Sequence, residues 1–310
     1  MDIQRIVVTG RLFQEMKPLL SGVVSKQIQF LPEEEVTRDV LVWADAFVAF
    51  KPVRNFDFYN IKWVHCLGAG VDGFLYSRKW KKDVLLTRTN AAFGDKVSEY
   101  CISYMLAHLQ QHEAFKINQA LHQWRRIEPI PFYKKKVVLF GTGVIAQEIA
   151  RKLGGFHVIP DGVSLSGHAK PGFNRIVKVE QAAELLEDAD WVINTLPLTT
   201  GTKNLLDQSI FDKMKGACFI NVGRGATVEE RAMINALEAG NLQLAILDVF
   251  SEEPLPEDSK LWAIPGIRIT PHIAAVTTAE EAAAEFLSTL SAIENNGFPL
   301  SNQVDYSQGY

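Results

Sequence analysis

The 310-residue sequence lacks several features that would place it at a membrane or on nucleic acid. No run of about 18 apolar residues occurs, which is the length that a membrane-spanning helix needs. The N-terminal apolar stretch is too short for the core of a secretion signal. The net charge is only -4, so no strong field gathers nucleic acid or an anionic membrane surface. We therefore expect a cytoplasmic protein that acts on small molecules, without a nucleic-acid or membrane partner.

Cysteine is also scarce. Cys66, Cys101 and Cys218 are odd in number and lack the spacing of metal ligands. They predict buried, reduced thiols and no disulfide framework. The histidines show no ligand arrangement with cysteine or aspartate partners, so we expect no metal. The basic run at residues 134–136 flanks a linker without interleaved aromatic residues and is interpreted as a solvated face.

Length and composition favour two domains. Hydrophobic residues make up 47% of the chain and charged residues 22%, which is typical of globular proteins, and the chain is long enough for two cores. Short apolar runs bounded by turn residues predict a small α/β domain over residues 1–95; they lie at residues 6–9, 27–30, 46–50, 63–67 and 84–87. One buried face at helical spacing then predicts a long helix from residue 96 to about 118, which would cross between the domains.

The second half of the chain alternates strand and helix patterns. Strands are expected at residues 137–140, 158–160, 191–195, 217–222, 244–249 and 267–270. This alternation predicts an α/β fold with a doubly wound parallel sheet, a Rossmann-type dinucleotide-binding domain over residues 96–272. A last helix, at residues 278–295, is expected to return to the first domain. Residues 273–310 would thus complete the smaller, flavodoxin-like substrate domain.

A glycine loop lies where such a domain binds its cofactor. Gly141-Thr142-Gly143-Val144-Ile145-Ala146 follows an apolar strand and opens a helical pattern, so the cofactor pyrophosphate would lie at the helix N-terminus. Gly141 permits the tight turn and Gly143 lets the backbone approach the phosphates, whereas Ala146 stands where a third glycine is usual. Such a loop alone can be a β–α turn without a ligand. Its position between a strand and a helix predicts that it binds NAD or NADP.

The choice between NAD and NADP depends on the segment after the second strand of this domain. A ribose-binding carboxylate is expected about 20 residues beyond the first glycine. Asp161 is one candidate, but an ungapped alignment places Ser164 there, and serine does not repel a 2′-phosphate. Ser166, His168 and Lys170 follow in the same loop. Both cofactors stay open, with a slight preference for NADP. The remaining predicted cofactor-binding residues are Leu196, Pro197, Thr202, Val222, Gly223 and Asp248.

Three residues after later strands supply the chemistry of a 2-oxo acid reduction. Arg224, in a glycine-flanked turn, can hold a carboxylate and polarise the adjacent 2-oxo oxygen. His272 can give the proton that the new alkoxide needs. Glu253 can hold the imidazole and favour its protonated form, with Glu252 as a rival for this role. Each residue taken singly has an ordinary structural explanation, but their combination with the glycine loop indicates hydride transfer.

The smaller domain contributes a further candidate. Gly68-Ala69-Gly70-Val71-Asp72-Gly73 follows an apolar strand, and the N–H groups of Ala69 and Gly70 could bind the substrate carboxylate. The alternative is a tight glycine turn without a ligand. We expect the substrate to lie between the two domains.

Taken together, these motifs resemble the D-isomer-specific 2-hydroxyacid dehydrogenases. The resemblance spans nearly the whole chain and is greatest to the glyoxylate/hydroxypyruvate reductase branch, through Pro254-Leu-Pro256 with Leu261-Trp262 and through residues 271–277. It implies that Arg224, Glu253 and His272 are catalytic, that Ala69 and Gly70 contact the substrate, and that the chain forms a homodimer through its cofactor domain. The product would be a D-2-hydroxy acid. Formate dehydrogenases share the architecture but pair the histidine with glutamine, which Glu253 argues against.

Two alternatives remain within the same resemblance. A phosphoglycerate dehydrogenase would need extra cations for the phosphate, and Lys51 and Arg54 are the candidates. A cofactor-sensing corepressor, a binding protein instead of an enzyme, keeps the same three residues. Turnover of 2-oxo acids separates the enzyme from the binding protein.

Overall fold

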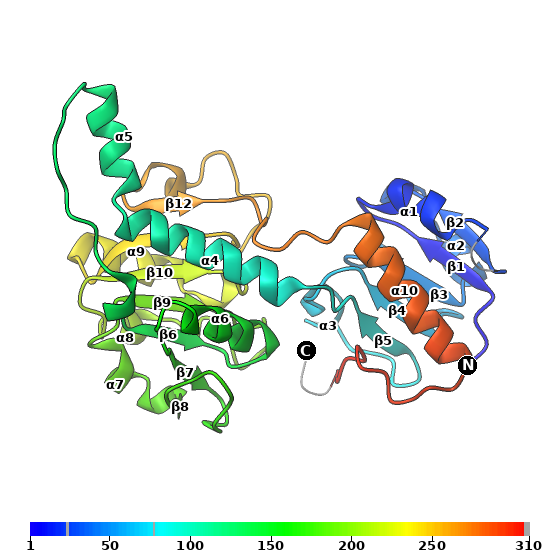
Figure 1. Ribbon diagram of the computed structural model, residues 1–310. Helices are drawn as coiled ribbons and strands as arrows, with labels where there is room; N and C mark the ends of the chain where they lie inside the picture. Colours follow the sequence, from blue (N-terminus) through cyan, green and yellow to red (C-terminus); the bar gives the residue numbers. More distant parts are fainter. Residues whose placement is uncertain (23–24, 77, 307–310) are drawn as a thin grey trace. The chain divides into compact units, whose positions relative to one another are not determined.

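The computed structural model divides the chain into two compact units. It describes residues 1–22, 25–76 and 78–306, so the end of the predicted segment 273–310 lies outside the described residues. The first unit consists of residues 1–91 and 276–310, and the second of residues 92–275 (Figure 1). Among the described residues, no helix combines the length and apolar character that crossing a bilayer requires.

The first unit is built on a five-stranded parallel sheet in the order β2-β1-β3-β4-β5. Its strands are β1 (Arg5–Val8), β2 (Gln27–Phe30), β3 (Ala46–Ala49), β4 (Trp63–Cys66) and β5 (Leu85–Arg88). Every residue of β3 and β4 is buried, as expected for central strands that are covered on both faces. The strand order is that of flavodoxin-like folds, which confirms the predicted fold class for this part of the chain.

Helices cover both faces of this sheet. They are α1 (Phe13–Leu20), the 3-10 turn η1 (Glu33–Glu35), α2 (Arg38–Trp43), α3 (Asp72–Leu75) and α10 (Ala279–Glu294). Thr278 and Glu281 form a reciprocal capping box that starts α10. The Phe286 ring of α10 stacks on Trp63 of β4 at 5.2 Å between centroids. Residues from the two ends of the chain therefore share one hydrophobic core.

The second unit contains a seven-stranded parallel sheet in the order β12-β11-β10-β9-β6-β7-β8. Its strands are β6 (Val137–Phe140), β7 (Asp161–Ser164), β8 (Ile176–Lys178), β9 (Trp191–Asn194), β10 (Ala217–Asn221), β11 (Leu242–Leu247) and β12 (Ile267–Ile269). All pairs are parallel, so the doubly wound fold is confirmed. The winding direction reverses between β6 and β9, and ligands of such sheets bind beyond the carboxyl ends of the strands at this point.

The helical segments of the second unit are mostly short. They are α4 (Phe93–Leu109), α5 (His112–Ala120), η2 (Phe132–Lys134), α6 (Val144–Gly154), η3 (Val179–Gln181), α7 (Ala183–Leu186), α8 (Gln208–Phe211), η4 (Gly225–Thr227), α9 (Glu230–Ala239) and η5 (Lys260–Ala263). The first of them, α4, packs along α6 (Figure 1). This contact places a long buried face of α4 beside the helix that follows the glycine loop.

Three sequence predictions about elements were wrong. The single helix predicted over residues 96–118 is two helices, interrupted where Gln111 adopts a left-handed conformation with φ of 61°. The strand predicted at residues 158–160 begins only at Asp161, because Pro160 has no N–H to give to a sheet. Strand β8 was missed, since this edge strand is only three residues long and none of them is buried.

Candidate active site

The glycine loop occupies the carboxyl end of β6, at the point where the winding of the sheet reverses. Gly141 has a φ of 93°, and a Cβ atom there would lie 2.5 Å from Thr195 Oγ1, so only glycine fits. Gly143 caps α6, and a Cβ atom on it would meet nothing within 4 Å. The amino end of α6 is thus open to a phosphate group, whereas Ala146 behind it is fully buried.

The two candidates for the ribose site lie at opposite ends of β7. Asp161 begins β7, at the edge of the sheet opposite the glycine loop, and its carboxylate accepts a hydrogen bond from Asn174 Nδ2 at 2.9 Å. Ser164 ends β7, on the same edge as Gly141, and its Oγ accepts a hydrogen bond from the Gly167 N–H at 3.1 Å. Ser164, and not Asp161, therefore lies on the edge of the sheet that carries the glycine loop.

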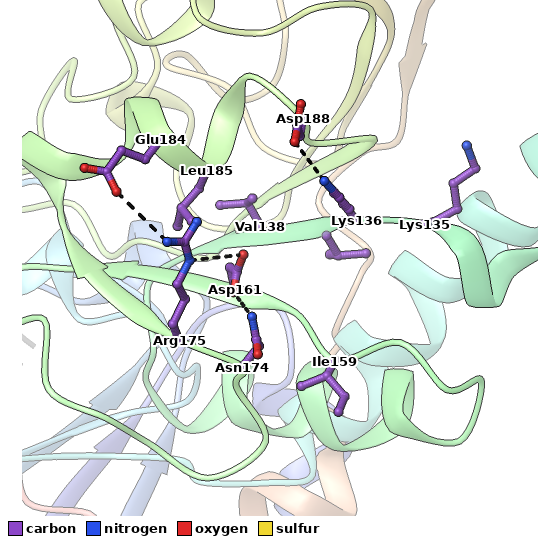
Figure 2. Close-up of a pocket in the computed structure, with 11 residues that line it drawn as sticks. Lys135, Lys136, Val138, Ile159, Asp161, Asn174, Arg175, Glu184, Leu185 and Asp188 are labelled. Carbon is purple, nitrogen blue, oxygen red and sulfur yellow. Dashed lines mark hydrogen bonds and ion pairs between the residues drawn. The ribbon is translucent and has the colours of Figure 1, made fainter.

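A cavity of about 320 Å³ lies at the opposite edge, beside Asp161 (Figure 2). Its charged side chains pair with one another: Lys136 Nζ lies 2.8 Å from Asp188 Oδ2, and Arg175 Nε lies 3.7 Å from Asp161 Oδ2. This cavity is at the amino ends of β6 and β7, away from the glycine loop. It is not part of the candidate active site.

The loop after β9 is held against the end of β10. Asn194 Nδ2 donates to Asn221 Oδ1 at 2.9 Å, and the same Oδ1 accepts from the Gly223 N–H at 3.2 Å. Sequence reasoning missed this buried amide pair, although a polar residue ends each of two apolar strands. Of the predicted cofactor residues, Leu196 is buried and its backbone lies against Gly223, where a Cβ atom would be 2.6 Å from the Leu196 carbonyl oxygen.

Other predicted cofactor residues lie close by on the same two loops. Thr202 Oγ1 donates to the Pro197 carbonyl at 2.6 Å and accepts from the Thr199 N–H at 2.8 Å, so this hydroxyl closes the loop after β9. Val222 is half-buried directly after β10, and its N–H donates to the Asn194 carbonyl at 3.1 Å. The loops after β6, β9 and β10 therefore border one edge of the sheet.

The position of Arg224 depends on the glycines on either side of it. A Cβ atom on Gly225 would overlap the backbone of Phe250, so the turn after β10 packs directly on the segment after β11. The half-buried Arg224 side chain donates from Nη1 to the Gly223 carbonyl at 2.8 Å. The glycine after Arg224 thus allows two backbones to approach closely.

Glu253 and His272 are in direct contact. Glu253 Oε2 lies 2.7 Å from His272 Nδ1, and Oε1 accepts a hydrogen bond from the Phe250 N–H at 2.9 Å. Burial alone would raise the pKa of the Glu253 carboxyl, but these two hydrogen bonds and the charges of His272 and Arg224 lower it overall. The structure thus brings all three predicted catalytic residues together, and it selects Glu253 over Glu252 as the partner of the histidine.

Asp248 anchors the turn that carries His272. Its buried carboxylate accepts hydrogen bonds from Thr270 Oγ1 at 2.6 Å and from the N–H groups of Ile273 and Ala274, each at 2.8 Å. His272 has a φ of 54°, a conformation that needs such support in a residue other than glycine. Asp248, a predicted cofactor-binding residue, thus supports the turn that carries His272 through its carboxylate.

Tyr100, which sequence reasoning missed as a site residue, contacts the threonine that is bound to Asp248. The Tyr100 hydroxyl is 2.7 Å from Thr270 Oγ1, so α4 is connected to the histidine turn. Burial is the main reason that the pKa of Tyr100 is raised. Its position in α4 fits an amphipathic helix, so the sequence carries no signal that separates it from a core residue.

In the first unit, the Gly68–Gly70 turn follows β4 at the carboxyl end of that sheet. Cys66 Sγ donates to the Gly70 carbonyl at 3.3 Å, and Thr277 Oγ1 donates to the Leu67 carbonyl at 3.0 Å. Within the described parts of the chain, the amides of Ala69 and Gly70 have no hydrogen-bond acceptor. These N–H groups are therefore available for an anion.

Comparison with known proteins identifies the family. Residues 102–274 match the model of the D-isomer specific 2-hydroxyacid dehydrogenase NAD binding domain. The chain belongs to the D-isomer specific 2-hydroxyacid dehydrogenase family. It is an oxidoreductase that uses NAD(P) to interconvert 2-oxo and 2-hydroxy acids.

Individual relatives include enzymes with named substrates. The chain is 33% identical over 277 residues to glyoxylate/hydroxypyruvate reductase A of Salmonella choleraesuis (strain SC-B67), covering 86% of this chain and 87% of the relative. It also resembles the structure of an NADPH-dependent glyoxylate/hydroxypyruvate reductase from Sinorhizobium meliloti with NADP and sulfate, at 28% identity, full coverage of both chains and a TM-score of 0.87. A family member from Xanthobacter autotrophicus Py2 with NADPH and MES has 28% identity, full coverage of both chains and a TM-score of 0.85.

Proposed function

We propose that the protein reduces glyoxylate and hydroxypyruvate to the corresponding 2-hydroxy acids, with the D configuration where the product is chiral, and that it prefers NADPH. The observation that carries this proposal is the Glu253–His272 pair with Arg224 beside it, in the unit that holds the glycine loop. The names of the Salmonella and Sinorhizobium relatives support these two substrates.

The three side chains divide the chemistry between them. Bound NAD(P)H supplies the hydride for C2 of the 2-oxo acid. Arg224 holds the substrate carboxylate and polarises the 2-oxo oxygen, where negative charge grows. His272 transfers its proton to that oxygen, so one hydride and one proton complete the reduction. Glu253 orients the ring through Nδ1, which leaves Nε2 to give the proton.

Backbone groups would hold the rest of both ligands. We assign the cofactor phosphates to the loop of Gly141, Thr142, Gly143, Val144 and Ile145 at the amino end of α6. The N–H groups of Ala69 and Gly70 bind the substrate carboxylate. NADP is favoured because Ser164 carries no charge that repels a 2′-phosphate and because His168 and Lys170 follow β7. Similar structures that contain NADP or NADPH support this preference.

A homodimer and a cytoplasmic location complete the proposal. Residues 112–130, here called the arm, comprise α5 and the segment after it. This segment returns to the end of α4, where the Ile130 N–H donates a hydrogen bond to the Leu109 carbonyl at 2.9 Å. The arm extends from the sheet of its own unit (Figure 1) and exposes a row of large apolar side chains, namely Phe115, Ile117, Leu121, Trp124 and Ile130. A second copy of the chain would cover such a surface. The three cysteines, all buried and unbridged, suit a reducing compartment.

A kinetic panel tests the proposed activity. Purified protein is mixed with NADPH or NADH and with glyoxylate, hydroxypyruvate, pyruvate or 3-phosphohydroxypyruvate, and the loss of absorbance at the nicotinamide band is followed. We expect the highest kcat/KM with glyoxylate or hydroxypyruvate and NADPH. Preference for the phosphorylated acid would favour the phosphoglycerate dehydrogenase alternative, and cofactor binding without any turnover would favour the corepressor alternative.

The roles of the side chains are tested separately by Arg224→Ala and His272→Ala. Each variant should lose at least about 100-fold in kcat/KM, the usual size of one positioned catalytic group. The affinity for NADPH, measured by fluorescence titration, should stay near that of the wild type. Near-normal turnover in either variant would rule out the mechanism.

A further inference from the structure

Arg88 ends β5 and lies beside the turn that we assign to the substrate carboxylate. In the parallel register of β4 and β5 it is opposite Cys66, directly before that turn. Its Nη1 donates a hydrogen bond to the Ala69 carbonyl oxygen at 3.1 Å. Burial lowers the pKa of the Arg88 guanidinium and the neighbouring Cys66 raises it, but arginine stays charged at physiological pH. The turn thus receives a charge-assisted hydrogen bond from β5.

This contact sets the direction of one particular amide. In a planar trans peptide, the carbonyl of one residue and the N–H of the next point in opposite directions. Because Arg88 holds the Ala69 carbonyl, the Gly70 N–H points away from the guanidinium. The Gly70 N–H makes no hydrogen bond to another described residue, so it is left to face a ligand.

The Ala69–Gly70 peptide differs from its neighbours in what holds it. A hydroxyl, that of Thr277, donates to the Leu67 carbonyl, and a thiol, that of Cys66, donates to the Gly70 carbonyl. The Ala69 carbonyl accepts from a cation instead. A cation at the carbonyl end polarises the peptide, which strengthens its N–H as a donor.

We propose that Arg88 is a positioning residue of the substrate site: by holding the Ala69 carbonyl, it orients and polarises the peptide whose Gly70 N–H binds the substrate carboxylate. This role rests on the proposed function, because it presumes a carboxylate at this turn. It involves no proton transfer and no direct contact between Arg88 and the reacting atoms. Arg88 should therefore govern how tightly the anion binds and leave the chemical step unchanged.

The variant Arg88→Met tests this role, because it removes the charge and the donors while keeping an unbranched apolar stem. We expect the KM for glyoxylate to rise about tenfold, the effect of losing one charge-assisted hydrogen bond, with kcat within about twofold of the wild type. The KM for NADPH should not change. A second readout is calorimetric titration of oxalate, an unreactive dicarboxylate, into the enzyme saturated with NADP; its Kd should rise by the same factor.

The matched control is Arg78→Met. Arg78 is in the same unit, and its Nη1 also donates to a backbone carbonyl, that of Phe56, at 3.2 Å. This control should leave oxalate binding unchanged. Arg88→Lys keeps the charge on a shorter group and should bind oxalate with an affinity between those of the wild type and the Met variant. Circular dichroism shows whether Arg88→Met folds. If it does not fold, the Lys variant decides, and an affinity of Arg88→Lys for oxalate equal to that of the wild type overturns the proposal.

The outcomes separate this proposal from the proposed function. If the wild type fails to reduce any 2-oxo acid but binds oxalate in a manner that depends on Arg88, the proposed function fails and the role of Arg88 stands. If the wild type reduces glyoxylate and Arg88→Met keeps both the glyoxylate KM and the oxalate Kd, the role of Arg88 fails and the proposed function stands. A fall in kcat without a change in KM also overturns it.

Discussion

At the scale of single residues, the catalytic chemistry that we propose depends on an ionised carboxylate, that of Glu253. The hydrogen bonds from His272 and from the Phe250 N–H outweigh the burial of Glu253, so the pKa of its carboxyl is below the ordinary value. Attraction between two charges acts equally on both, so the Glu253 carboxylate favours the protonated imidazole that reduction requires. The Glu253 carboxylate is therefore stabilised as an anion beside the ring of His272.

The variant Glu253→Gln should shift the pH dependence of reduction in one direction. A neutral amide does not stabilise the imidazolium, so the essential proton is lost at a lower pH. The alkaline limb of the kcat/KM profile for reduction should move down by about one pH unit, the typical effect of one adjacent opposite charge. The measurement is a pH–rate profile with saturating NADPH.

Glu252 offers the matched control, since it precedes Glu253 in the same acidic turn. Glu252→Gln removes the same charge without touching the contact between Oε2 and Nδ1. Its profile should superimpose on that of the wild type. Equal shifts in the two variants would mean that general surface charge, and not the observed pair, governs the proton.

At the scale of elements, glycines in the turns after the strands have two distinct tasks. Gly225 lets the turn after β10 lie directly against the Phe250 backbone, which belongs to the segment that carries Glu253. Gly143 has open space around it at the start of α6. The first glycine is thus required by the protein itself, and the second by the ligand that we assign to this space.

Alanine substitutions separate these two tasks. Gly225→Ala forces a methyl group into a backbone and should lower the Tm of the cofactor-free protein by several degrees, as overpacking costs on the order of 1–3 kcal/mol. Gly143→Ala should leave that Tm unchanged but weaken NADPH binding about tenfold, because its methyl group occupies the phosphate space. Thermal melts without cofactor and NADPH titrations measure the two effects. Wild-type NADPH affinity in Gly143→Ala would show that the loop does not hold the phosphates.

At the scale of the whole molecule, the arm carries the proposed dimer contact. Leu121 and Trp124 are strongly exposed for apolar residues of their size, at 60% and 105%. An open groove of about 510 Å³ between α4 and α6 in the same unit is lined by apolar groups that include Ile102, Leu106 and Phe156. An exposed apolar arm and an apolar groove on one unit suit a reciprocal contact between two copies.

A double substitution tests the dimer. Leu121→Ser with Trp124→Ser should convert the protein to a monomer, because both apolar anchors of the arm are removed. Light scattering coupled to size-exclusion chromatography gives the mass of wild type and variant. Ile159→Ser removes an apolar side chain that is 65% exposed elsewhere in the same unit, and it should leave the mass unchanged. A monomeric wild type would contradict the proposal directly.

The sequence by itself determined the class of fold and indicated the residues of the candidate site. Apolar runs of strand length marked ten of the twelve strands in the described part of the chain, and polar or glycine-rich motifs followed those strands that border the candidate site. These predictions succeeded because burial on both faces of a parallel sheet leaves a local signature in the chain. The predictions for residues 158–160 and β8 failed, since a proline and a short edge strand weaken that signature.

Only the tertiary structure decided which groups meet. It shows that Glu253, and not Glu252, contacts His272, and that Ser164, and not Asp161, lies at the edge with the glycine loop. It also shows that the Asp248 carboxylate accepts hydrogen bonds from the turn that carries His272. It also joined Arg88 to the Ala69 carbonyl. The physical reason is the range of the interactions: periodicity is encoded over a few neighbouring residues, whereas these contacts depend on the register of strands and turns far apart in the chain.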